Sequence, residues 1–320
     1  MPGGVISTRT EIQAAAKVME QTFQNESQDT PPKYPMLFND VSTDPKRSFA
    51  MFMPYAGLGV LKQKTEGGTP TYDQPYELIP TTWTYQTYAL AATITEEAQL
   101  EDPLGLMAEL PKMLARSERK TKDLLYTLIL NLGFAPNVLG SDGLPLFAAA
   151  HPLGPIATPT GAISSIGQTF SNSLGATQLT PEALYQMQVL FETQRDDRGL
   201  TMRGTMVDLV VGVQLGKIAA ECIGAPLAPY TTNNTPNTEH KVLNLVVNEY
   251  LTNTYGWYGL GNKSGGKLGG DAHSLSVAHK WQNRVKTWID PQTDNWNIKT
   301  SFRSTYGFVT WNNVVGSSGG

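Results

Sequence analysis

The stretch from Ser141 to Leu153 constrains this chain more than any other segment. Asp142-Gly143 is a tight-turn pair, and the apolar residues 144–147 that follow it predict a short strand. His151-Pro152 then predicts an exit from regular structure, because the residue before a proline avoids helical backbone angles. No known chemistry needs this order of residues, so we interpret the segment as structural.

Composition leaves the fold open but restricts the partners. A chain of 320 residues buries a sizeable core as one large or two ordinary domains. Only 16% of residues are charged, against about 25% in typical domains, and 30 Gly and 21 Pro indicate many loops. A large neutral surface suits permanent subunit contacts, although many secreted β-rich proteins share this composition. The net charge of −4 argues against a dedicated nucleic-acid binder, so any DNA contact must be local.

The single cysteine and the apolar runs indicate the compartment. Cys222 has no partner for an intrachain disulfide and lies in a predicted short buried helix, which fits a reducing cytoplasm during assembly. The first residues lack a signal-peptide pattern. No apolar run approaches the roughly 20 residues of a membrane span, since the best covers residues 124–132. We expect a soluble protein with no membrane partner.

The N-terminal third predicts a helix, an arm and a hairpin. Thr8 and Glu11 form a capping-box pattern, and helical spacing of apolar residues extends to about residue 25. Prolines then make an extended arm that needs another surface to lie on. Residues 49–92 alternate like strands around a turn at 66–68. An isolated hairpin is marginal, so this one packs on another subunit or on the rest of the chain; an ordinary edge hairpin is the alternative.

A long helix is predicted over residues 111–132, with Pro111 as its first residue and a length of about 33 Å. Its apolar stripe consists of Met113, Leu114, Leu124, Leu125, Leu128 and Leu132. Basic residues gather in its first half: Lys112, Arg116, Arg119, Lys120 and Lys122. They form either an ordinary solvated face or a face toward DNA or a scaffold.

The second half predicts a mixture of helices and strands. Thr180 with Pro181 begins a helix that ends before Asp196-Asp197-Arg198-Gly199. Strands follow at residues 206–213, 241–251, 255–260 and 274–279, and a long strand at 297–310. The expected class is α+β.

Catalytic patterns are missing. The four histidines, His151, His240, His273 and His279, lack metal-ligand spacing, and no Gly-x-Ser-x-Gly motif occurs. The glycine-rich segments lack the strand-loop-helix setting of a phosphate site. A pairing of Cys222 with a histidine is the one nucleophilic alternative. We expect no enzyme and no catalytic, cofactor-binding or metal site.

The order of these pieces resembles the Mu-like major head subunit family, which uses the Hong Kong 97 capsid fold of tailed bacteriophages. The resemblance rests on the arm, the hairpin, the basic helix, the Asp142-Gly143 to His151-Pro152 segment, the Thr180-Pro181-Glu182 helix, Asp197-Arg198-Gly199 and the last strand with Tyr306-Gly307-Phe308. It implies an N-terminal arm (1–47), an extended loop (48–92), a peripheral domain (93–200) with a spine helix (111–132), an axial domain (201–290) and a long returning strand (291–320).

The resemblance also implies a function. A major capsid protein of this kind self-assembles as hexamers and pentamers into the icosahedral head that encloses double-stranded DNA. The implied partners are further copies, portal and scaffold proteins, DNA through non-specific contacts, and decoration proteins as a further candidate. No long coiled-coil segment precedes the arm, so we expect a separate scaffold or prior cleavage. The expected locations are the host cytoplasm during assembly and then the virion.

Three groups of site residues follow from the resemblance. Lys112, Arg116, Arg119, Lys120 and Lys122 are candidates for contact with DNA or scaffold on the inner face. The intersubunit candidates on the hairpin are Lys62, Lys64, Glu66, Tyr72 and Tyr76. Some relatives weld the shell by a Lys–Asn isopeptide bond, for which Lys62 or Lys64 and Asn295 are the matching positions. Residues 296–305 contain no carboxylate to accept the lysine proton, so we expect a non-covalent shell. A tail tube or sheath subunit, or an enzyme, is the alternative function.

Overall fold

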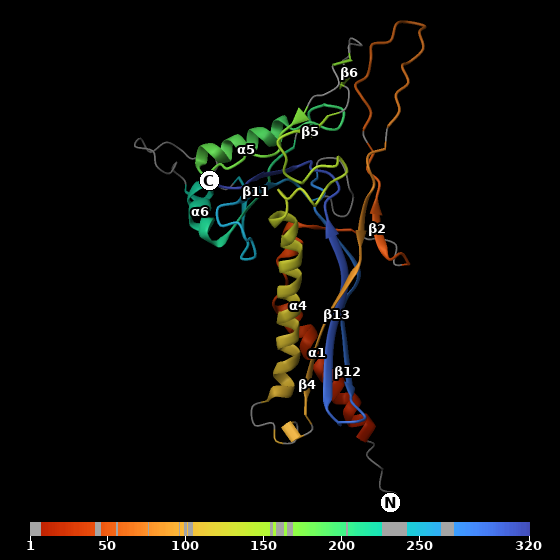
Figure 1. Cartoon of the computed structure of the whole chain (residues 1–320), viewed down its shortest axis with the longest axis vertical. Helices are drawn as coiled ribbons and strands as arrows, with labels where there is room; N and C mark the ends of the chain where they lie inside the picture. Colours follow the sequence, from red (N-terminus) through yellow and green to blue (C-terminus); the bar gives the residue numbers. More distant parts are fainter. Residues whose placement is uncertain are drawn as a thin grey trace, which may run out of the picture.

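The computed structural model describes residues 8–41, 46–55, 57–75, 77–95, 97–98, 101, 105–153, 156–157, 163–164, 169–202, 204–225, 242–263 and 272–320. Figure 1 shows an elongated part below, a compact part above it and a loop that projects at the top. Short elements between the main ones are α2 (Tyr34–Leu37), η1 (Val213–Leu215), β1 (Asn39–Asp40), β5 (His151–Pro152), β6 (Ile156–Ala157), β7 (Ile163–Ser164) and β8 (Thr169–Phe170).

The elongated part is a sheet covered on one face by two helices. Its strand order is β1-β12-β13-β4, and the central strand β13 (Trp296–Gly307) is antiparallel to both β12 (Ser276–Ile289) and β4 (Gln86–Ile94). Alternate residues of β13 are buried, because successive side chains of a strand point to opposite faces. Trp296 and Ile298 pack with Phe23 of α1 (Thr8–Asp29) and Leu114 of α4 (Leu106–Asn131). The predicted long strand near the C-terminus is therefore confirmed.

The compact part is a second sheet with a helix layer. Its order is β10-β9-β11-β14, formed by β10 (Asn244–Val247), β9 (Asp208–Val211), β11 (Trp257–Leu260) and β14 (Val314–Ser317). Leu184, Met187 and Phe191 of α5 (Pro181–Thr193) are fully buried against this sheet, together with Cys222 of α6 (Gly216–Gly224). Thr180 caps α5 as expected, since its hydroxyl accepts a hydrogen bond from the Ala183 amide at 3.1 Å.

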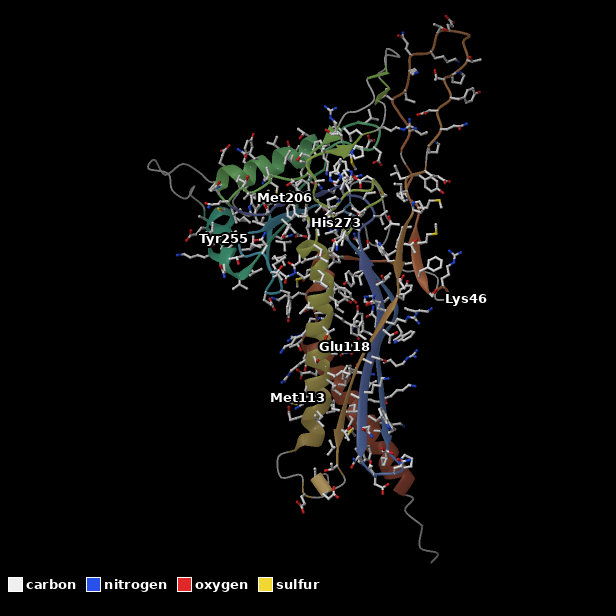
Figure 2. All side chains as sticks on the ribbon, in the orientation of Figure 1. Lys46, Met113, Glu118, Met206, Tyr255 and His273 are labelled. Carbon is white, nitrogen blue, oxygen red and sulfur yellow. The ribbon has the colours of Figure 1, made fainter. Side chains whose placement is uncertain are left out.

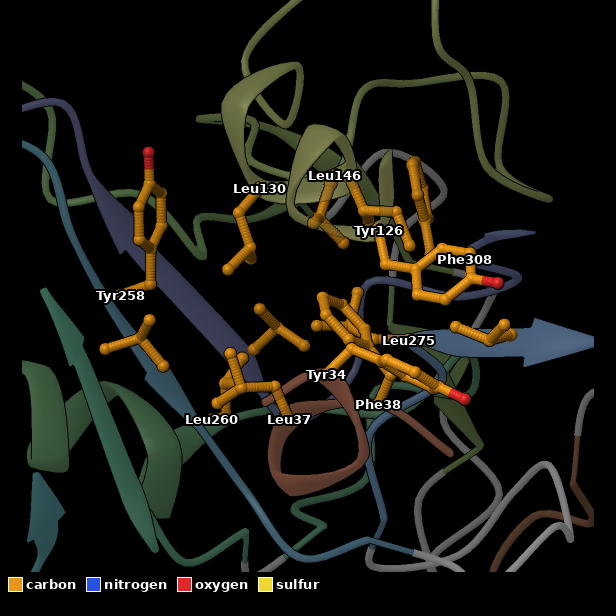
Figure 3. Packing of buried hydrophobic residues seen from close by; sticks show 14 of the residues in the cluster. Tyr34, Leu37, Phe38, Tyr126, Leu130, Leu146, Tyr258, Leu260, Leu275 and Phe308 are labelled. Carbon is orange, nitrogen blue, oxygen red and sulfur yellow. The ribbon is translucent and has the colours of Figure 1, made fainter. Parts of the chain in front are cut away.

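A third cluster of buried side chains joins the two parts (Figure 3). Tyr126 and Leu130 of α4 meet Tyr258 of β11, Leu146 and Phe308 there. Leu146 and Phe147 are thus buried as the sequence suggests, but residues 144–147 form no strand. The Phe147 amide instead donates to the carbonyl of Gly133, directly after α4, at 2.9 Å.

Several element boundaries differ from the sequence prediction. Helix α4 begins at Leu106, so Pro111 lies inside it and removes a single hydrogen bond one turn back. Met113, Leu124 and Leu132 are exposed, and the buried stripe runs through Leu114, Ala115, Tyr126, Ile129 and Leu130. In Figure 2, Met113 lies on the side of α4 away from the sheet. Helix α1 continues to Asp29, beyond the expected end near residue 25.

The strands also differ. Strand β12 continues ten residues past the expected end at residue 279, through register shifts around Trp281 and a left-handed Asn283 (φ 46°). These irregularities break the alternation on which a strand prediction depends. Of the expected strand 241–251, the structure describes residues 242–251, and among these only residues 244–247 pair.

Three elements pair or pack across the expected domain boundaries. Strand β4 belongs to the long sheet although the extended loop was expected to continue to residue 92. Helix α5 packs with the second sheet although residues 93–200 were assigned to the peripheral part. Strand β12 pairs with β13 in the long sheet although residues 201–290 were assigned to the axial part. In each case long-range pairing, which sequence order does not reveal, decides the boundary.

Candidate assembly interface at the base of the extended loop

The loop of residues 57–75 projects from a short hairpin. Strand β2 (Phe49–Phe52) pairs with β3 (Thr81–Thr84), and a bridge between Tyr55 and Glu77 extends this pairing. Beyond it, residues 57–65 and 69–75 are extended but form no ladder, contrary to expectation. The turn is where the sequence placed it: Gly67 has φ 72°, and the Gly68 amide donates to the Thr65 carbonyl at 3.0 Å.

The candidate contact residues of the loop are open to solvent. Lys62, Lys64, Glu66 and Tyr72 are all exposed, whereas Tyr76 lies outside the described residues. Leu61 is 95% exposed and Tyr72 is 87% exposed. These two side chains are therefore available for contact with another surface.

Arg198 fixes both limbs of the loop where they leave the hairpin. Its Nε donates to the Gly57 carbonyl at 2.9 Å, and its guanidinium donates to the Gln74 carbonyl at 2.7 Å. The Asp73 carboxylate lies 3.6 Å from the same guanidinium and accepts a hydrogen bond from the Gly59 amide at 2.8 Å. The hydrogen bond from the Gly59 amide lowers the pKa of Asp73, and the Gln74 amide and the nearby charges of Arg198 and Lys62 lower it further. The planar guanidinium therefore bridges two strands that have no ladder of their own.

The turn that carries Arg198 is held by Asp196. Its Oδ1 accepts from the Arg198 amide at 2.9 Å and from the Leu200 amide at 2.7 Å. Gly199 completes the turn with φ 75°. The Asp197-Arg198-Gly199 motif contributes to the family resemblance, but the sequence did not predict that Arg198 holds the loop. A sequence does not show which distant backbone carbonyls an arginine side chain binds.

Replacing Arg198 with Gln should loosen the loop without unfolding the subunit. The two hydrogen bonds that hold the limbs are lost, and because Gly57 and Gln74 are exposed, their carbonyls can bond to water instead. Proteolysis at residues 57–75 should accelerate severalfold while the melting temperature changes little. Lys217→Gln, at an exposed lysine on α6, is the control. An unchanged cleavage rate in Arg198→Gln would exclude the clamp.

The hairpin is seated on the long sheet by Trp83. Its indole lies over Gly307, where an added Cβ would come within 2.4 Å of the ring, and Phe52 packs on Trp83 at 4.5 Å between ring centroids. Only glycine permits this approach.

Gly307→Ala should therefore displace Trp83 and destabilise the subunit by about 1–3 kcal/mol, the usual cost of overpacking. Chemical denaturation followed by tryptophan fluorescence measures the effect. Gly57→Ala is a matched control, because nothing lies within 4 Å of its added Cβ. Equal stability of the two variants would contradict the packing argument.

A cavity of about 570 Å³ opens beside the clamp. Met51, Met53 and Tyr55 line one side, and Asp196, Asp197 and Met202 line another. Burial, then the neighbouring charges of Asp196 and Asp142, raise the pKa of Asp197 to about 6. The cavity is therefore apolar with an acidic side.

The segment from Ser141 to Leu153 closes on itself through His151. Its Nδ1 lies 2.5 Å from Asp142 Oδ2, and its Nε2 lies 3.0 Å from Asn172 Oδ1. The Asn172 amide nitrogen donates to the Leu146 carbonyl at 2.7 Å, which fixes its oxygen as an acceptor. Both ring nitrogens thus lie within hydrogen-bond distance of side-chain oxygens. The ring is fully buried and stacks on Trp311.

The other described histidines do not converge on a site. His273 lies beside Asn39, and His279 lies 3.2 Å from the Tyr34 hydroxyl. Burial lowers the pKa of each to about 4, so both rings are neutral at neutral pH. His240 lies outside the described residues. The described residues contain no group of three or more His, Cys, Asp or Glu side chains placed to hold a metal ion.

The basic candidates on α4 separate into two kinds. Lys122 is buried, pairs with Glu118 at 2.8 Å and donates to Asn283 at 2.6 Å, so its expected role on an exposed inner face is wrong. Glu118 lies between α4 and the sheet in Figure 2. Arg116 pairs with Glu26 at 2.7 Å and Lys112 with Glu109 at 2.6 Å, both partly exposed. Lys120 is exposed and Arg119 is half-buried.

The positions matched to a cross-link lie far apart within one chain. Asn295 ends the turn between β12 and β13. In Figure 1 this turn lies at the opposite end of the molecule from the projecting loop of residues 57–75, which carries the two lysines. A bond between them would have to join different copies. Residues 296–305 contain no carboxylate of their own, but a carboxylate from another element lies beside them, because Glu118 of α4 accepts a hydrogen bond from Thr300. That carboxylate is already paired with Lys122.

Comparisons with known proteins identify the family. The family model described as "Phage capsid protein" matches residues 80–315. The chain belongs to the phage capsid protein family. No curated protein matches it. As a phage capsid protein, this chain forms the shell of the phage head.

Solved structures agree in fold. A chain from Microbacterium phage Oxtober96 is 11% identical, with a TM-score of 0.53, 91% of this chain covered and 87% of that one. The Bacteriophage JBD30 capsid gives 16% identity and a TM-score of 0.53, with 70% of this chain and 92% of that one covered. Mycobacterium phage Bobi gives 10% identity and a TM-score of 0.52, with 90% of each chain covered. Such low identities establish the shared fold alone. Within the described residues, no helix has the length and apolarity to cross a membrane.

Proposed function

We propose that this phage capsid protein is the major head subunit of a tailed phage, of the Mu-like kind with a Hong Kong 97-type fold. Hexamers and pentamers form through the compact part, and the extended loop lies across an adjacent copy. The shell is icosahedral, encloses double-stranded DNA and is held without covalent bonds between subunits. Portal and scaffold proteins act during assembly in the host cytoplasm, and decoration proteins are candidate partners of the finished shell.

The observation that carries the proposal is the clamped loop. Arg198 fixes the two limbs at Gly57 and Gln74, yet beyond them Leu61 and Tyr72 are almost fully exposed. An ordered base with an uncovered apolar end is suited to contact another subunit, and many modest contacts of this type add through multivalency.

Electron microscopy with size-exclusion chromatography tests the proposal on the purified protein, alone and with its scaffold. Closed polyhedral shells or capsomer rings are expected. Open tubes would favour a tail protein, and a small single species under all conditions would exclude a shell subunit.

The partly exposed basic residues of α4 face the packaged DNA in this proposal. Changing Lys112, Arg116, Arg119 and Lys120 together to Gln should lower the fraction of DNA-filled particles severalfold, since cationic contacts to phosphate supply non-specific affinity. Lys217→Gln is the control, and DNA content per particle is the measurement. If shells of normal shape package as much DNA as the parent, these side chains of α4 do not contact DNA and the proposal for this helix face is wrong.

A further inference from the structure

A row of apolar side chains lies on one face of the hairpin base. Phe49, Met51, Met53 and Tyr55 occupy alternate positions and are all exposed, Tyr55 by 59%. Alternate residues of an extended segment point to the same side, so the four form a continuous apolar row. Strand β2 pairs only with β3 among the described strands, so the row lies at the margin of the molecule.

The cavity beside this row combines apolar and acidic walls. Met51, Met53 and Met202 are adaptable side chains that suit an inserted aliphatic group. Asp196 and Asp197 provide carboxylates at the same cavity. Burial, followed by the charges of Asp196 and Asp142, raises the pKa of Asp197, so this wall of the cavity is acidic.

The loop offers a segment of matching chemistry. Leu61 is followed by Lys62 and Lys64, so an aliphatic group adjoins two positive charges. The Leu61 side chain is 95% exposed, which means that it does not fill the cavity of its own chain. The Arg198 clamp keeps the two limbs in this outward course. A second copy is therefore the natural source of the occupant.

We propose that Leu61 and Lys62 of one copy dock in the cavity of the next copy, with Leu61 against Met51, Met53 and Met202 and Lys62 beside Asp197. The inference rests on the proposed shell function and names the contact through which the loop acts. The contact joins different surfaces of the two copies, so its repetition generates a closed ring, as capsomers require, when the rotation between neighbours closes, and an open filament when it does not.

Reciprocal charge reversal tests the pairing. Lys62→Glu and Asp197→Lys should each raise the protein concentration needed for capsomer formation by about tenfold or more, because each places like charges together. In an equal mixture, the acidic loop of the Lys62→Glu variant meets the basic cavity of the Asp197→Lys variant, and the unchanged Lys62 of the second variant meets the unchanged Asp197 of the first. Alternating rings with an even number of subunits should therefore reappear in the mixture. A mixture that assembles no better than either variant alone, while both melt like the parent, would overturn the proposal.

Cysteine pairs give a readout that does not depend on the charge variants folding. In a Cys222→Ser background, Leu61→Cys with Met202→Cys should form disulfide-linked multimers on oxidation of assembled protein. Leu61→Cys with Val213→Cys is the control, since Val213 is exposed but lies on the compact part away from the cavity. Multimers limited to the first pair support the contact. Assembled shells without these links would refute the docking site and leave the shell function standing, whereas absence of any shell would refute the function itself.

Discussion

A chain in which Asn-Gly replaces residues 60–72 is expected to fold as a stable subunit and to form no closed shells. The Gly59 amide bonds to the Asp73 carboxylate at 2.8 Å, so a two-residue turn is long enough to join the two limbs there. The shortened chain keeps Gly57, Gln74 and the whole Arg198 clamp. Because none of the deleted residues is buried and most are exposed, their removal should change the melting temperature little.

The matched control keeps the loop at full length and carries Thr65→Ser at its turn. Particle counts by electron microscopy and the melting temperature are compared in both variants. Closed shells of normal size from the shortened chain would contradict a role of the loop in assembly. A large fall in its melting temperature would instead show that the loop supports its own subunit.

Replacing His151 with Leu should produce the largest loss of stability among the single substitutions considered. The change leaves the Asp142 carboxylate and Asn172 Oδ1 without their ring partner in a buried site. Leaving a buried acceptor without its hydrogen-bond partner costs about 1–3 kcal/mol, and more when the acceptor is charged. The free energy of unfolding from denaturant titration measures the effect.

A double-mutant cycle separates this network from simple loss of volume. Asp142→Leu alone, His151→Leu alone and the combined variant are compared. The combined loss should be smaller than the sum of the single losses, because the second change removes the group that the first left unpaired. Additive losses would show that the two side chains stabilise the fold independently.

Local patterns predicted the elements whose signals are local. Thr180 with Pro181 marked the start of α5, and the short helix around Cys222 followed from its apolar residues. The turn at residues 66–68 required a glycine, and Gly67 indeed has positive φ. These features depend on neighbours within a few residues, which a sequence displays directly.

The features that sequence reasoning missed depend on contacts between distant segments. The strand predicted at residues 274–279 is shorter than the observed β12, because bulges in β12 interrupt the alternation of side chains. Lys122 was placed on an exposed face, although Glu118 and Asn283 hold it under the helix. Arg198 and the methionine-lined cavity were missed for the same reason, although the alternation of Phe49, Met51, Met53 and Tyr55 was a signal that could have indicated an apolar contact row.

The Arg198 clamp binds the backbone carbonyls of Gly57 and Gln74, and its guanidinium lies 3.6 Å from the Asp73 carboxylate. The direction in which the loop leaves the subunit is therefore largely independent of the identity of the residues between Leu58 and Tyr72. In a head protein built in this way, substitutions in the projecting loop can change which neighbouring surface the loop binds, while the fold of the rest of the subunit stays the same.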